Sequence, residues 1–299
     1  MAGKQNNVET EGAHGRDKKI SVSCLNLVLH PHTPKKYVDF LSTLNDMKIA
    51  IKVRGDDALC IGSFLKDEDG DAYVGEIHKY LNLDASADWY NVKRNSIATK
   101  ADVDGVVIPD DLRPHFKKYQ FVFFPEGHRF FYVSKSSTDT LSPALLKKFF
   151  EGASMSEALA SFGNFAVTVE PQVGSSEKLF LMPRISRIDM EINRPNPDDH
   201  AGLDAQVQER LRRINAKKEI LAYVAADSVG LQPDAELKGL ALVAASNGKV
   251  VVKGRNDSNE IVTQSTENLP LTEPASYNPD IQSERSVLVE VARSIRQVL

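Results

Sequence analysis

Two helix-start signals of the same kind stand beside alternating apolar segments in this sequence, and this combination limits the possible folds. Thr33-Pro34 and Ser142-Pro143 each place a capping hydroxyl before a proline. Proline is tolerated at the first helical position because the N–H that it lacks has no partner there. The flanking segments alternate apolar and polar residues with the period of two that is typical of strands. Strands and helices therefore interleave along the chain, and we predict an α+β fold.

A first α+β module is predicted over residues 20–110, after a polar, aperiodic tail over residues 1–19 that we expect to be disordered. Its first strand is ISVSCLNLVLH (20–30), and the helix that follows Thr33 has one apolar side. Three more strands are predicted at 48–54, 58–67 and 72–82. The turn-rich segments GDD and DEDGD separate them.

A second α+β module is predicted over residues 111–200. A hairpin around Pro125-Glu126-Gly127 comes first, and the helix that starts at Ser142 follows. Ser154 and Glu157 have capping-box spacing before a further helix that Gly163 can end. Strands are predicted at 165–171 and 186–193. We expect two small mixed or antiparallel sheets, with a ferredoxin-like arrangement as one possibility, and helices packed on one face of each.

The last third of the chain is predicted to be mainly helical. Residues 201–265 should form two helices followed by a C-terminal hairpin, with an apolar stripe from Val207 to Val224 on the first helix. Residues 266–283 have the composition of a linker, and residues 284–299 read as an amphipathic terminal helix. That helix can dock on its own domain or on a second subunit, and the sequence leaves both options open.

Composition narrows the classes of protein. The chain has 41% hydrophobic and 26% charged residues, and no run approaches the ~18 apolar residues that a spanning helix requires. The first residues lack the apolar core of a secretory signal, and only Cys24 and Cys60 are available to pair. We therefore predict a cytoplasmic protein that does not span a membrane. Its net charge of −4 means that any nucleic-acid contact needs a local basic patch.

Motifs for common enzyme classes are absent. The sequence contains no GxxxxGK[ST], GxGxxG, HExxH, CxxC or GxSxG, and we predict no cofactor and no metal. His30 and His32 with Lys35 are candidates for metal-independent RNA cleavage, although a polar strand-to-helix junction explains them more simply. Asp189 and Glu191 share one strand face, as metal ligands of a nuclease would, but any solvated strand face has the same pattern.

Basic residues near element ends are the better candidates for a binding site, because side chains there can meet phosphates. This candidate nucleic-acid-binding set consists of Lys117, Lys118, Arg129, Arg184, Arg187, Arg210, Arg213 and Lys217. Each residue alone is explained by an ordinary charged surface. In the hairpin, His128 and Arg129 read as turn and rim, with Arg129 as a phosphate contact.

Several segments carry a resemblance to known families. The hairpin, the Leu-Ser-Pro helix, the Val-Glu-Pro end at 169–171 and the strand SRIDMEIN resemble RexA-like phage-exclusion proteins, mainly over residues 119–194. GHRFFY, RPNPDD and SNGKVVVKG are similar to a bacterial family of uncharacterised proteins associated with phage defence. RexA-like proteins are dimeric, sequence-tolerant DNA binders that sense infection and act with a membrane partner. The resemblance therefore implies nucleic-acid sensing by a dimer and carries over no catalytic residue.

Three functional hypotheses follow. The first is a nucleic-acid-binding sensor of bacterial antiviral defence that prefers DNA to RNA, forms a homodimer and signals to a separate effector protein. The second is an RNA-processing or toxin-like ribonuclease that uses His30, His32 and Lys35. The third is a non-catalytic scaffold that joins a defence complex through its terminal helix.

Overall fold

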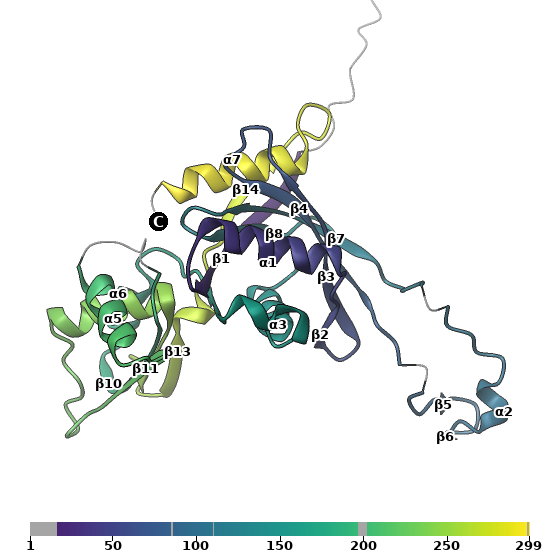
Figure 1. Cartoon of the computed structure of the whole chain (residues 1–299). Helices are drawn as coiled ribbons and strands as arrows, with labels where there is room; N and C mark the ends of the chain where they lie inside the picture. Colours follow the sequence, from purple (N-terminus) through teal and green to yellow (C-terminus); the bar gives the residue numbers. More distant parts are fainter. Residues whose placement is uncertain (1–16, 85, 110, 197–201, 298) are drawn as a thin grey trace, which may run out of the picture.

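A computed structural model describes residues 17–84, 86–109, 111–196, 202–297 and 299. Within this part of the chain, strands and helices form a large body, a smaller domain beside it and a projecting arm (Figure 1). The α+β class predicted from the sequence is confirmed. The ferredoxin-like arrangement is not confirmed, because the strands combine in a different way.

The body is built on one curled antiparallel sheet with the order β14-β1-β8-β7-β4-β3-β2, in which β9 also pairs with β1. Its strands are β1 (Lys18–His30), β2 (Ile51–Arg54), β3 (Asp57–Lys66), β4 (Tyr73–Leu81), β7 (Lys117–Phe124), β8 (Arg129–Lys135), β9 (Asn164–Val169) and β14 (Glu273–Tyr277). β14 pairs with residues 18–22 of β1, and β9 pairs with residues 25–30. β8 pairs with residues 21–26 and overlaps both, so it lies on the opposite edge of β1.

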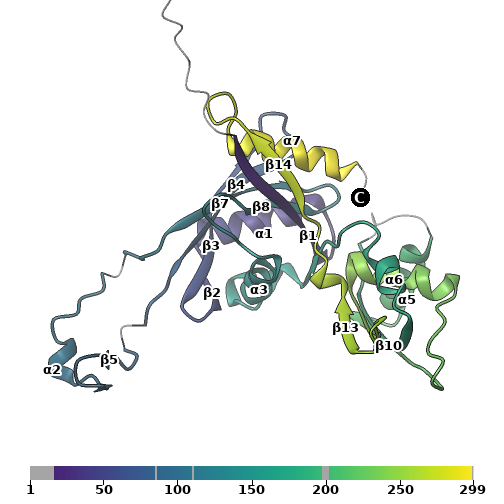
Figure 2. The same cartoon turned by 180° about the vertical axis from the view of Figure 1, so that it is seen from behind.

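Helices cover both faces of this sheet. Helices α1 (Pro34–Asp46) and α3 (Pro143–Ser154) begin at the two predicted caps: Thr33 accepts a hydrogen bond from the Lys36 N–H and Ser142 from the Leu145 N–H. Their apolar sides pack against one face of the sheet. Helix α7 (Glu284–Arg296) packs against the other face (Figure 2). The terminal helix therefore docks on its own body.

The alternation of β1 distributes its side chains between these two cores. Leu25, Leu27 and Leu29 belong to the core under α1 and α3, which also holds most of the phenylalanines. Ile20, Val22 and Cys24 belong to the core under α7. The alternation of apolar and polar residues in ISVSCLNLVLH is typical of a half-buried strand, but β1 is covered on both faces.

The smaller domain contains a four-stranded antiparallel sheet with the order β11-β10-β12-β13. Its strands are β10 (Arg184–Asn193), β11 (Lys218–Val224), β12 (Gly248–Arg255) and β13 (Ile261–Ser265). Helices α5 (Leu203–Arg213) and α6 (Ala235–Asn247) pack on one face of it. Shorter helices complete the connections: α4 (Ser175–Leu179) and the 3₁₀ turns η1 (Glu157–Phe162) and η2 (Thr266–Asn268).

The small domain is inserted between two strands of the body. The chain leaves after β9 and returns before β14, and both strands lie along the same edge of β1. Two hydrogen bonds close the neck: the Gln172 N–H donates to the Leu269 carbonyl at 2.8 Å, and the Leu271 N–H donates to the Glu170 carbonyl at 2.8 Å.

Three further predictions are corrected by this topology. The two α+β modules at 20–110 and 111–200 are not separate, since β7 pairs with β4 and β8 pairs with β1 in one sheet. The first helix of the last third ends at Arg213, and residues 218–224 form a strand because they pair with β10. The predicted linker at 266–283 contains β14. In each case a long-range pairing decided the structure, and the local pattern of a segment does not identify its partner strand.

Helix α7 should be essential to the stability of the body, because Leu288 is fully buried in the core beneath it. We expect Leu288→Ala to lower the free energy of unfolding by about 2–5 kcal/mol, because apolar burial is reduced and a cavity is left behind. Urea denaturation of both proteins measures this difference. The matched control is Ile281→Ala, since Ile281 is 80% exposed just before the helix. Equal stability of Leu288→Ala and the wild type would contradict this packing.

Candidate nucleic-acid interface

The structure divides the predicted basic set between the two sheets. Lys117, Lys118 and Arg129 lie on β7 and β8 of the body, whereas the other five belong to the small domain or border it. Carboxylates pair with five members of the set: Lys117 with Asp139, Lys118 with Glu76, Arg129 with Glu170, Arg187 with Asp189, and Arg210 with Glu219. These eight residues therefore do not form a single basic face.

Arg129 is buried, although the sequence predicts it as an exposed phosphate contact. Its side chain is only 12% exposed, and its Nε lies 3.4 Å from a carboxylate oxygen of Glu170, which is 4% exposed. A guanidinium that is buried against a carboxylate is not available to a phosphate, because the pair is already desolvated and matched in charge. The predicted rim position is wrong for this residue.

Three members of the set keep exposed charge within the described residues. Arg184 begins β10, Arg213 ends α5, and Lys217 precedes β11. No ion pair joins any of them to a carboxylate of the described chain. All three lie in the small domain.

One face of the small sheet is not covered by helices. Ile188, Met190 and Ile192 of β10 point into the core beneath α5 and α6, so the residues between them point to the opposite face. The strand register extends this open face across all four strands. It comprises Arg187, Asp189, Glu191 and Asn193 of β10, Lys218, Ile220, Ala222 and Val224 of β11, Lys249, Val251, Lys253 and Arg255 of β12, and Ile261, Thr263 and Ser265 of β13.

The open face carries a net positive charge, because it has five basic and two acidic residues. Two of its five basic residues are neutralised, since Arg187 binds Asp189 and the ammonium of Lys218 lies 3.1 Å from Glu191. The hydrogen bond from Arg187 lowers the pKa of Asp189, so this carboxylate stays charged. Three basic residues of β12 have no carboxylate partner among the described residues: Lys249, Lys253 and Arg255. Their positions along one strand span roughly 20 Å at about 3.4 Å per residue.

Grooves continue this positive strip at both ends. One groove of ≈ 310 Å³ lies between the body and the small domain, where α3 and β9 face Lys217, Lys218 and Lys249. Another of ≈ 270 Å³ is lined by Arg184, Lys253 and Arg255 at the bulge of β10. Two predicted residues, Arg184 and Lys217, therefore border the same face, at opposite ends.

The sequence did contain a signal for the residues that we missed. In KVVVKGR (249–255), Lys249, Lys253 and Arg255 are separated by even numbers of residues, so a strand projects all of them to one side. The described positions of the open face hold no aromatic residue. The face can therefore bind phosphates and pack aliphatic groups, but it offers no platform for base stacking.

The histidines of the ribonuclease hypothesis are engaged in structural contacts. The Nε2 of His30 lies 2.9 Å from the Arg194 carbonyl, to which it donates, and His32 contacts the hydroxyl of Tyr37 at 3.0 Å. Lys35 is exposed on α1 and binds Asp39 at 2.6 Å. Burial lowers the pKa of His30. Within the described residues, no group of three or more His, Cys, Asp or Glu is placed to hold a metal ion. Asp198 and Asp199, which follow Asp189 and Glu191 in the sequence and could add carboxylates to a metal site, lie outside the described residues.

His128 belongs to a buried network that joins the body to the small domain. Its ring is fully buried, with Nδ1 2.9 Å from Oδ1 of Asn26 and Nε2 3.0 Å from Nδ2 of Asn196. Asn26 in turn donates to the Ser246 carbonyl in α6 at 3.0 Å. Because an amide oxygen only accepts and an amide NH₂ only donates, His128 is neutral and carries its proton on Nδ1.

Tyr37 completes this network from α1. Its hydroxyl accepts hydrogen bonds from the Leu29 N–H at 2.9 Å and from Nδ2 of Asn196 at 3.0 Å. Its own proton is therefore directed to Nδ1 of His32, 3.0 Å away. Residues of β1, α1, the β7–β8 turn, the chain after β10 and α6 thus share one buried polar junction, which fixes the small domain on the body.

Burial, followed by the nearby charge of Arg129, lowers the pKa of His128 to about 2. The folded protein therefore excludes a proton that the unfolded chain binds below its ordinary pKa of about 6.5. Stability from this residue is present above that value and is lost as the pH falls. Between pH 7 and pH 5, the free energy of unfolding should fall by roughly 2 kcal/mol because of His128. We expect His128→Asn, which tolerates the positive φ of this position, to abolish this part of the pH dependence. Urea midpoints of both proteins at each pH test this, and identical pH profiles would contradict it.

Within the described ranges, no helix has both the length and the apolar character that are needed to cross a membrane.

A search of the curated proteins finds no match to the chain. The family model described as Domain of unknown function (DUF4747) matches residues 18–293, from the start of β1 to the last turns of α7, and so includes the body, the arm and the small domain. By this match over almost its whole length, the chain belongs to the DUF4747 family.

Proposed function

We propose that this protein binds nucleic acid through the open face of its small domain, by contacts to phosphates with little readout of bases. The observation that carries the proposal is the strip formed by Lys249, Lys253 and Arg255, three cations on the uncovered face of β12 without described carboxylate partners. A helix-covered sheet with an open basic face presents a broad surface to a phosphate backbone, and flexible lysines tolerate many sequences.

The wider role proposed here is that of a cytoplasmic sensor in bacterial antiviral defence, which binds DNA in preference to RNA and passes its signal to a separate effector. Support for this role comes from the resemblance of residues 119–194 to RexA-like phage-exclusion proteins. The small domain is firmly attached to the body. Because a buried network and a two-stranded neck attach it to the body, a ligand on its open face acts on a domain that is held in a fixed position.

Removal of the three unpaired cations tests the interface. We expect Lys249→Ala/Lys253→Ala/Arg255→Ala to weaken duplex binding about equally for different sequences. The slope of log K against log salt should become shallower by up to about 0.9 for each cation that no longer meets a phosphate. Fluorescence anisotropy across a salt series measures both effects. Lys66→Ala is the control, because Lys66 is exposed at the end of β3 in the body, outside the interface.

The same titration separates the competing hypotheses. A wild-type affinity that does not change with salt concentration would contradict the proposed interface. So would an equal affinity of the triple variant and the wild type. Gels of the recovered probe show whether RNA has been shortened. A cleaved probe whose cleavage depends on His32 would favour the ribonuclease instead. Labelled duplex DNA, single-stranded DNA and RNA in parallel test the preference for DNA.

A second prediction concerns the acidic residue that restrains the interface. Glu191 holds the ammonium of Lys218 at 3.1 Å on the open face. We expect Glu191→Gln to tighten nucleic-acid binding and to steepen the slope of log K against log salt by up to about 0.9, because Lys218 becomes available to one phosphate. Glu151→Gln is the matched control: Glu151 lines the same groove from α3 but does not neutralise the open face. Weaker binding by Glu191→Gln would be inconsistent with a phosphate at this position.

A further inference from the structure

The connection between β4 and β7 is far longer than the sheet requires. These neighbouring strands pair directly from Tyr73↔Phe123 to Lys79↔Lys117, and a few residues would join them. The chain instead inserts residues 82–116, here called the arm. The arm contains β5 (Tyr90–Asn91), β6 (Ser96–Ile97) and helix α2 (Lys100–Val103). Figures 1 and 2 both show these elements at the lower end of the molecule, well away from the body.

Local contacts give the tip of the arm a defined structure. The carboxylate of Asp102 accepts hydrogen bonds from the Thr99 N–H at 2.7 Å and from the Thr99 hydroxyl at 2.9 Å. Arg94 forms an ion pair with the same carboxylate. The Ala98 N–H donates to the Trp89 carbonyl at 2.6 Å. Two-residue strands and a one-turn helix are not stable alone in water, because they bury too little apolar surface. The tip therefore has the properties of an element that packs on a partner.

Apolar side chains of the arm face solvent in unusual number. Seven of them are at least 45% exposed: Tyr90, Val92, Ile97, Val106, Val107, Leu112 and Phe116. Clustered exposed apolar residues mark protein–protein contact sites. Nucleic acid is a poor partner for this segment, since most of these side chains are aliphatic and the arm has six aspartates against four lysines and arginines.

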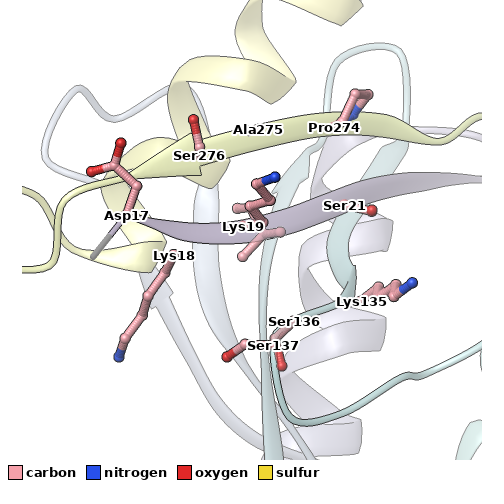
Figure 3. A pocket seen from close by; sticks show the side chains of 11 residues that line it. Asp17, Lys18, Lys19, Ser21, Lys135, Ser136, Ser137, Pro274, Ala275 and Ser276 are labelled. Atoms are coloured by element: carbon pink, nitrogen blue, oxygen red, sulfur yellow. The ribbon is translucent and has the colours of Figure 1, made fainter.

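A groove with complementary properties lies at the other end of the sheet. β8 ends at Lys135, opposite Ser21, so the preceding residues of β1 pair with β14 on one edge only, within the described chain. The resulting sheet-end groove has a volume of ≈ 880 Å³. Figure 3 shows Lys18, Lys19 and Lys135 on the strands that border it, and Asp17 is the one acidic residue among the described residues that line it. This groove offers an open strand edge and positive charge to an acidic, apolar segment.

We propose that the arm of one molecule docks in the sheet-end groove of a second copy, and that the exchange is reciprocal. β14 lies at the upper end of the molecule in Figures 1 and 2, and the arm lies at the lower end. Two copies placed side by side and antiparallel bring each arm to the other groove, which closes a two-fold dimer. The arm contains 35 residues, and a stable interface uses about 20–30 residues a side.

Substitutions on the arm test this dimer without disturbing a core. Val92 and Ile97 are 80% and 67% exposed, so Val92→Asp/Ile97→Asp should leave each protomer folded and raise the dimer dissociation constant roughly 100-fold. Light scattering over a concentration series measures the mass, and circular dichroism checks the fold. Ile281→Asp is the control, because Ile281 is 80% exposed outside the arm and the groove. Its mass should match that of the wild type.

Cross-linking identifies the surface that receives the arm. Asp104→Cys on the arm and Ser137→Cys in the groove, made in one chain, should yield a two-chain product with a bismaleimide reagent, since native Cys24 and Cys60 are buried. A cross-link within one chain would overturn the exchange. So would a monomeric wild type, a dimer that survives Val92→Asp/Ile97→Asp, or assemblies larger than two. The proposal does not depend on nucleic-acid binding: Val92→Asp/Ile97→Asp should retain salt-sensitive probe binding by each protomer.

Discussion

The whole body depends on the environment of β1, which is covered on both faces and has partner strands on both edges along its middle. β8 pairs with one edge, while β14 and β9 follow one another along the other edge. Leu27 packs beneath α1 and α3, and Val22 packs beneath α7. Burial on both faces favours apolar side chains, and the buried polar residues Ser23 and Asn26 of this strand are hydrogen-bonded. Its pairing also brings the first and last described strands together, so the end of the chain stabilises its beginning.

This arrangement explains where the small domain lies. The domain interrupts the edge of β1 between β9 and β14, so both of its connections start from adjoining places on the body. Asn26, in the middle of β1, then reaches α6 through its hydrogen bond to Ser246. An inserted domain with two close connections and a buried polar contact has little freedom to rotate. The open face of its sheet is therefore presented in one orientation.

The buried junction illustrates how polar residues specify such an orientation. Hydrogen bonds between Asn26, His128, Asn196 and Tyr37 have direction, unlike apolar contacts, and a displaced domain would leave several of them buried and unmade. Their burial also accounts for the neutral state of His128. His128, which the sequence predicts as a turn residue of the hairpin, is thus an interior residue, because Asn196 and the small domain cover the end of that hairpin.

The sequence by itself determined the local secondary structure at several positions. Thr33 and Ser142 begin helices as predicted, the alternating segments form strands, and the terminal amphipathic segment is a helix, since these features follow from caps and periodicity within a few residues. The membership of each sheet was decided only by the tertiary structure. Residues 218–224 became a strand through pairing with β10, and Lys249 joined Arg184 and Lys217 around one face through the register of distant strands. Arg129 is absent from that face because β8 belongs to the sheet of the body, where Glu170, 41 positions along the chain, pairs with it. Pairings of this kind are chosen by the combined burial of the whole chain, and no short segment encodes them.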